Sequence, residues 1–134
     1  MPPIADLRTL LRTMEPVLNP GTYVFVTAAE HPPVDVSTVV ASIREPEGLS
    51  LILEESAAAA AGLVGMYRCA WITLLVHSDL SAVGLTAAIA SALRDDGISA
   101  NIVAGVHHDH LFVPAHRAQD ALAALHALQR TALL

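Results

Sequence analysis

The residues best placed to do chemistry lie in the segment 77–86, which joins an apolar run to a helical pattern. Free main-chain N–H groups at the start of a helix, together with the helix dipole, favour a bound carboxylate. Gly84 would let a ligand approach this main chain closely, and the Asp79 carboxylate could receive an α-amino group. The segment therefore fits recognition of a free amino acid. Its candidate residues are His77, Ser78, Asp79, Ser81, Val83, Gly84, Leu85 and Thr86.

The same residue types also permit a purely structural role for this segment. The side chain of Asp79 or Ser81 could cap the following helix, and Gly84 could pack against a strand. A segment of that kind would bind nothing. Residue types and spacing leave both interpretations open.

Two further places could contribute to a site. Asn101 stands beside Ile102 in an otherwise apolar run, where an unpaired buried amide would be costly. Asn101 would therefore either hydrogen-bond an adjacent strand edge or contact a ligand. Glu47 and Gly48 lie in a predicted hairpin turn, which could close a pocket formed by another unit of the protein. The alternative for Glu47 is an exposed acid in a turn.

The segment 107–110 (HHDH) could bind a transition metal, because imidazole and carboxylate groups are common ligands. Adjacent side chains of a hairpin point to opposite faces, so that few of these four converge easily. His77 or His116 would have to complete the set. We therefore expect no metal site and no cofactor. The alternatives are a polar connection, or contact of His108 and Asp109 with a small ligand.

Nothing in the sequence assigns an ordered set of catalytic roles. Cys69 lies among largely apolar residues, next to Arg68, and is expected to be a buried, unreactive thiol. The sequence contains no nucleophile elbow, phosphate-binding loop or paired-acid motif. We therefore expect that the protein is not an enzyme.

Composition excludes several classes of partner. The 134 residues carry 7 Lys+Arg, all of them Arg, against 13 acids, for a net charge of −6. A chain without a basic stripe is not expected to bind nucleic acid. Its weakly polar stretches fall short of the roughly 20 residues that span a membrane. The first residues show neither the basic region nor the apolar region of a signal peptide, so we expect a cytoplasmic protein.

Hydrophobic periodicity predicts a mixture of strands and helices. Leu85, Ile89 and Leu93 recur every four residues, and Gly97 can close their helix in the left-handed conformation. The predicted strands are Thr22–Thr27, Val39–Arg44, Leu49–Glu54, Ala70–His77, Ile98–Ala104 and Leu111–Val113. The predicted helices are Ile4–Met14, Ser56–Gly62, Ala82–Asp96 and Arg117–Arg130.

The order of these elements indicates the fold class. The second half follows the βαββαβ plan of ferredoxin-like units without its last strand, and the first half is a degraded copy. We predict an α+β protein of two such units, residues 1–67 and 68–134, each an antiparallel sheet with helices on one face. Strands could be shared between the units. Strand 22–27 could complete the second sheet, because an unpaired edge strand is a liability.

Several segments together resemble the ACT domain. They are 72–86 (ITLLVHSDLSAVGLT), 97–105 (GISANIVAG) and 108–114 (HDHLFVP). In the N-terminal half, residues 23–25 (YVF) and 44–53 (REPEGLSLIL) also resemble segments of that domain. The closer resemblance is to a family of small prokaryotic proteins made of two ACT-like units, and it covers nearly the whole chain.

This resemblance implies a ligand-sensing module. ACT domains generally bind amino acids at an interface between units, and the binding alters a partner enzyme or the assembly. The implied effector is an amino acid or related carboxylate at the interface around residues 77–86, and a homo-oligomer such as a dimer is expected. The sequence holds no kinase, dehydrogenase or DNA-binding segment, so the regulated partner is expected to be another chain. The alternatives are a structural or protein-interaction module without ligand, or a histidine-cluster metal-binding protein or enzyme.

Overall fold

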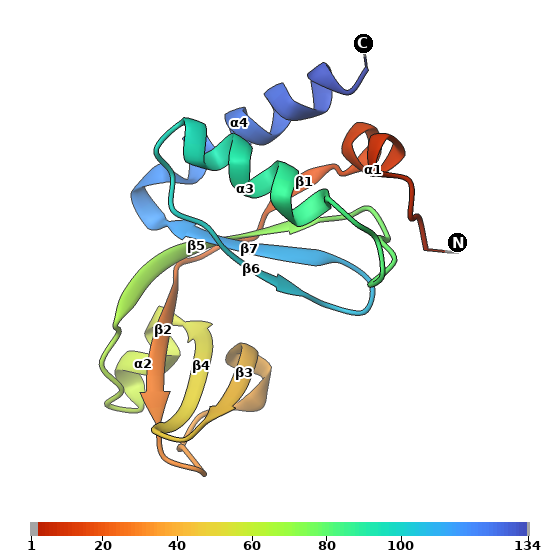
Figure 1. Cartoon of the computed structure of the whole chain (residues 1–134). Coiled ribbons are helices and arrows are strands. Elements are labelled where there is room, and N and C mark those ends of the chain that lie inside the picture. Colours follow the sequence, from red (N-terminus) through yellow and green to blue (C-terminus); the bar gives the residue numbers. More distant parts are fainter. Residues whose placement is uncertain (1–2, 134) are drawn as a thin grey trace. The chain divides into compact units, whose positions relative to one another are not determined.

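The computed structural model describes residues 3–133 (Figure 1). Its strands are β1 (Pro16–Leu18), β2 (Tyr23–Ala28), β3 (Val39–Glu45), β4 (Gly48–Glu54), β5 (Tyr67–Leu74), β6 (Asn101–Ala104) and β7 (Asp109–Pro114). Its helices are α1 (Leu7–Thr13), α2 (Glu55–Ala60), α3 (Leu85–Asp95) and α4 (Ala118–Thr131), with 3-10 helices η1 (Val36–Thr38) and η2 (Ala115–Arg117). Within this part of the chain, no helix has the length and apolar character needed to cross a membrane.

The chain divides into two compact units. The inserted unit comprises Pro20–Cys69, and the terminal unit comprises the described residues up to Asn19 and from Ala70 onward. In the inserted unit the strand order is β3-β4-β2-β5, and the neighbours are antiparallel. Helix α2 contributes Ala58 to a core formed with alternate residues of β2 and β4. The core residues are Val24, Val26, Ala28, Leu51, Leu53 and Ala58.

The terminal unit has the strand order β6-β7-β5-β1. Helices α1, α3 and α4 lie on one side of these strands (Figure 1). Because side chains alternate along a strand, one face of β5 and β7 points toward the helices and forms the core with them. The largest buried residues of this core are Leu10, Met14, Ile72, Leu74, Ile89, Leu93, Leu111, Val113 and Leu125.

The predicted fold class is confirmed: both units are antiparallel, ferredoxin-like sheets in an α+β protein. Gly97 closes α3 with a φ of +69°, as predicted. Helix α3 begins at Leu85 rather than near Ala82, because residues 79–82 form a turn instead of a first helical turn.

The compact units combine residues from both of the predicted sequence units, 1–67 and 68–134, and the boundary at residue 67 stays a prediction. Helix α1 and strand β1 belong to the terminal unit, because Leu10 and Met14 enter its core. Strand β1 pairs with β5 from Pro16↔Leu74 to Leu18↔Ile72 and takes the edge that lacks a strand in the second half. The strand predicted at 22–27 is β2, which pairs with β5 only along residues 67–69.

Candidate functional site

The segment 77–86 forms a corner of the terminal unit, between the end of β5 and the start of α3. Ile4 holds the beginning of this segment: its N–H donates to the His77 carbonyl at 2.8 Å, and its carbonyl accepts from the Asp79 N–H at 2.9 Å. Asp79 then closes the turn, since its Oδ1 accepts from the Ser81 N–H at 2.7 Å. Sequence reasoning missed Ile4 because this pairing is non-local.

The turn bears on the two roles considered for Asp79, which are contact with a ligand and capping of the following helix. One carboxylate oxygen of Asp79 is committed to the turn, which favours a structural role for this residue. Helix α3 begins with Gly84 as its N-cap, and no side chain of the described residues caps its first N–H groups. The main chain at the start of α3 is therefore free to meet an anion, as the binding interpretation requires.

Gly84 is required by its backbone conformation and by a close neighbour. Its φ is +98°, a region that side chains with a Cβ rarely adopt. A Cβ at this position would lie 3.1 Å from Cδ2 of Leu7 in α1. Gly84 thus packs against a helix, rather than against a strand as the structural interpretation suggested.

Replacement of Gly84 by alanine should lower the free energy of unfolding by about 1–3 kcal/mol, because of the strained backbone and the contact with Leu7. Urea denaturation measures this change. Gly97→Ala is the matched control, since Gly97 also has a positive φ but a Cβ there would meet nothing within 4 Å. Equal losses in the two variants would contradict a role for the Leu7 contact.

A small hollow of about 70 Å³ lies at this corner. It is lined by Ser78, Asp79, Leu80, Ala82, Leu85, Thr86, Ala104 and Asp109. The Ser78 hydroxyl donates to Oδ2 of Asp109 at 3.1 Å, and the two residues are only 6% and 8% exposed. This space is far smaller than the roughly 300–1,000 Å³ of a site that encloses a whole small molecule. The hollow can therefore receive the polar head of a ligand, with the rest of the ligand outside it.

The hollow brings together some of the predicted site residues. Those that line it are Ser78, Asp79, Leu85, Thr86 and Asp109. His77, Ser81, Val83 and Gly84 belong to the same loop and do not line the hollow. Sequence reasoning missed Leu80, Ala82 and Ala104, whose apolar side chains carried no chemical signal.

The remaining candidates lie elsewhere. Asn101 is exposed on β6, so the expected cost of burying its amide does not arise, and Ile102 packs against the core. Glu47 is an exposed residue of the turn between β3 and β4. Gly48 begins β4 in the inserted unit, where it lines a different hollow.

The histidines around β7 have separate neighbours. Nδ1 of His108 lies 3.4 Å from the Val76 carbonyl oxygen, whereas Nδ1 of His110 accepts from Nε1–H of Trp71 at 3.1 Å. The rings of His77 and His107 lie near each other, with centroids 5.5 Å apart. Among residues 3–133, no group of three His, Cys, Asp or Glu side chains is arranged to hold a metal ion.

Cys69 is buried, as predicted, with 0% of its surface exposed. Its Sγ lies 3.4 Å from the Tyr23 carbonyl oxygen, to which the thiol donates. Burial raises the pKa of the Cys69 thiol to about 12, because the thiolate would lose its hydration. The reactive thiolate is therefore scarce at neutral pH.

Solved structures share this fold. A crystal structure of a Vibrio cholerae protein of unknown function, described as a possible transport protein, is 48% identical over 92% of this chain and 95% of that chain, with a TM-score of 0.80. The regulatory subunit of aspartate kinase from Thermus thermophilus, in its ligand-free form, is 14% identical over 87% of this chain and 97% of that chain, with a TM-score of 0.63. An Agrobacterium tumefaciens protein is 15% identical over 81% and 84%, with a TM-score of 0.57.

Family models give the same assignment at the level of sequence. One ACT-domain model matches residues 2–70, and a second ACT-domain model matches residues 67–127. No curated protein matches the chain. The two matches span nearly all of the sequence, and the chain belongs to the ACT-domain family.

Proposed function

We propose that this protein senses a small molecule, an amino acid or a related carboxylate, at the corner formed by residues 77–86. ACT domains are regulatory modules, which supports a sensing role rather than catalysis. The observation that carries the proposal is the uncapped start of α3 beside the buried Ser78–Asp109 pair. The N–H groups of α3 would receive the carboxylate of the ligand.

Asp109 is the better partner for the ammonium group of such a ligand. Asp79 holds the turn, whereas the one side-chain hydrogen bond that Asp109 makes among the described residues is with the Ser78 hydroxyl. A carboxylate buried with a neutral partner gains strongly from an added cation, because it has lost most of its hydration. The arrangement supports a zwitterionic ligand that joins Asp109 to the start of α3.

The proposal includes a second copy of the chain that covers the ligand. Large apolar side chains are exposed beside the corner: Leu80 (64%) and Val83 (84%) in the loop, and Val106 (68%) in the turn between β6 and β7. Burial of such side chains against another surface is favourable. We accordingly expect a homo-oligomer, such as a dimer. The proposal also places the protein in the cytoplasm and takes another protein as the regulated partner.

A panel of the twenty free amino acids should raise the melting temperature for one or a few of them. A ligand present at 100 times its Kd adds about 2.7 kcal/mol to the free energy of unfolding when it binds only the native state. Asp109→Asn should abolish this rise, since the ammonium group would lose its charged partner. Differential scanning fluorimetry measures both effects.

Asp95→Asn is the matched control, because Asp95 is exposed and pairs only at the surface with Arg94. This variant should retain the full response. A flat panel for the unmodified protein would contradict the sensing proposal and would favour a protein-interaction module built on the exposed apolar residues. A rise only with divalent metal ions would favour the histidines instead.

A further inference from the structure

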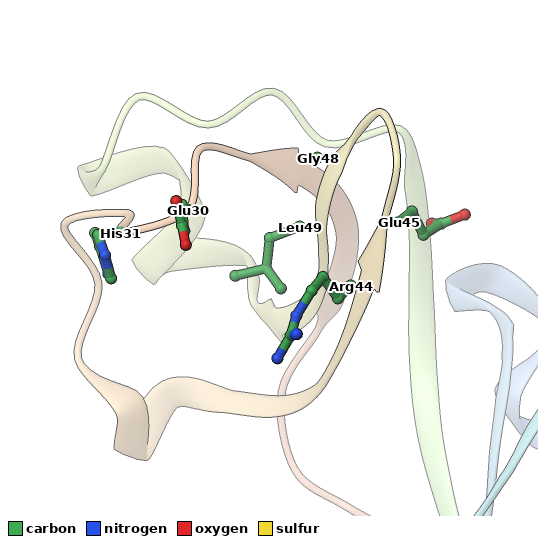
Figure 2. A pocket seen from close by; sticks show the side chains of 6 residues that line it. All are labelled: Glu30, His31, Arg44, Glu45, Gly48 and Leu49. Atoms are coloured by element: carbon green, nitrogen blue, oxygen red, sulfur yellow. The ribbon is translucent and has the colours of Figure 1, made fainter.

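The terminal unit contains a second hollow, of about 400 Å³, where helix α1 meets the end of helix α4 (Figure 1). The residues that line it are Leu7, Arg8, Leu11, Thr131 and Ala132. It shares none of them with the corner at residues 77–86, nor with the hollow of the inserted unit that Gly48 lines (Figure 2). Its volume falls within the roughly 300–1,000 Å³ typical of sites that hold a small molecule.

Two hydrogen bonds join the helices beside this hollow. Nε of Arg8 donates to the Ala132 carbonyl oxygen at 3.3 Å, and Nε2 of Gln129 donates to the Arg12 carbonyl oxygen at 2.7 Å. Thr131 is the last residue of α4 and Ala132 is its C-cap. Because both have short side chains, a space is left between the end of α4 and the leucines of α1.

Two leucines of α1 form the apolar part of the hollow. Leu7 and Leu11 lie one turn apart on the face of α1 that packs against the core, yet each keeps part of its surface exposed. Covering such side chains with another apolar group is favourable. Within residues 3–133, no acidic side chain lines the hollow. The lining therefore suits an apolar group that carries no positive charge.

The polar edge of the hollow is positively charged. Arg8 is exposed, and its bond to Ala132 uses one of the five N–H donors of a guanidinium. Arg12 follows one turn later on α1 and is also exposed. Asp6, the N-cap of α1, accepts from the N–H and the hydroxyl of Thr9. Two arginines and one aspartate give this segment a net charge of +1 in a chain of net charge −6, which favours a bound anion.

We propose that this hollow binds an aliphatic monocarboxylate, which combines one carboxylate with an unbranched apolar chain. The Arg8 guanidinium would donate to the carboxylate, and the chain would lie along Leu7 and Leu11. An ammonium group would meet no carboxylate among the described lining residues, so this ligand differs in class from the zwitterion proposed for the corner. The inference does not rest on the function proposed for residues 77–86.

Methyl NMR of the full chain, labelled at leucine methyl groups, tests the proposal with octanoate as the probe. The signals of Leu11, assigned with Leu11→Ile, should shift with octanoate below the concentration at which it forms micelles. Octanol has the same chain without the charge, octylammonium has the opposite charge, and acetate lacks the chain. Each of these three should bind at least about tenfold more weakly. Signals of Leu85 report binding at the corner separately, because Leu85 lines that hollow.

Arg8→Gln should weaken the binding of octanoate detected at Leu11 by at least about tenfold, through loss of a charge-assisted hydrogen bond. Arg94→Gln is the matched control and should change the affinity by less than about twofold. Arg94 is an exposed arginine of α3 that pairs with Asp95 and does not line the hollow. A cooperative melting transition in each variant shows that it folds. An equal affinity of the two variants would overturn the proposal.

Shorter acids test the apolar part of the hollow. From octanoate to butanoate, the affinity should fall by up to about fourfold for each methylene removed, because that group no longer covers Leu7 and Leu11. An affinity independent of chain length would overturn the proposal, as would an equal response to octanol or octylammonium, or no shift with octanoate. Leu11 signals that change with protein concentration alone would show that a second copy fills the hollow, which also contradicts the proposal.

Discussion

Replacement of Leu111 by alanine should lower the free energy of unfolding by about 2–5 kcal/mol. Leu111 lies on β7, has 0% of its surface exposed, and belongs to the core that the sheet of the terminal unit forms with α1, α3 and α4. Removing its buried methyl groups costs their transfer free energy and leaves a cavity. The size of the loss depends on how far the surrounding side chains can collapse into that cavity.

Urea denaturation followed by circular dichroism and by tryptophan fluorescence measures this loss with two probes. Leu133→Ala is the matched control, because Leu133 is 63% exposed and should change the free energy of unfolding by no more than about 0.5 kcal/mol. If the two leucine variants were equally stable, the position of Leu111 at the centre of the core would be wrong.

The fluorescence of Trp71 should follow the protonation of His110, with a midpoint below pH 6.5. Trp71 is the single tryptophan of the chain, and its Nε1–H donates to Nδ1 of His110 at 3.1 Å. Nδ1 must therefore be unprotonated in this hydrogen bond. Burial lowers the pKa of His110 below its usual 6.5, His108 adds to this effect through its charge, and Asp109 opposes it. A fluorescence titration from neutral to acidic pH measures the midpoint.

The same shift makes the stability of the fold depend on pH. Because the pKa of His110 is lower in the folded state than in the unfolded state, the fold favours neutral imidazole. The contribution of neutral His110 to the free energy of unfolding is complete above about pH 6.5. It declines as the pH falls from there through the folded-state pKa. His110→Gln should remove the fluorescence transition, and His31→Gln in the inserted unit should retain it. A midpoint at or above 6.5 would contradict the burial of His110.

The parts of the fold that the sequence predicted are those with strong local patterns. Leu85, Ile89 and Leu93 define the inner face of α3, and continuous apolar residues define β5. Strand β1 was missed because three residues are too few for a periodic signal, and its partner residues 72–74 lie far along the chain. The packing of α1 and β1 in the terminal unit was missed for the same reason, because it joins residues that lie far apart along the chain.

The corner at residues 77–86 was predictable as a location but not in its detail. The loop follows from the strand and helix on either side of it, and hydroxyl and carboxylate groups can be read directly from the sequence. The commitment of Asp79 to a turn and the pairing of Ser78 with Asp109 depend on tertiary geometry. The hollow of the inserted unit that Gly48 lines joins residues of the loop after β2 to residues at the turn between β3 and β4, which is again tertiary geometry. Of the residues that line this hollow, the sequence pointed only to Gly48 as a site residue, as part of a turn that could close a pocket formed by another unit.

The terminal unit is discontinuous in sequence, because Pro20–Cys69 interrupts it. During synthesis on the ribosome, α1 and β1 emerge before the inserted unit, whereas α3 and β7, which share their core, emerge only after it. The inserted unit is continuous and can close as soon as its own residues have left the exit tunnel. The segment that holds α1 and β1 must therefore wait, with Leu10 and Met14 still exposed to water, until the residues of β7 have been made.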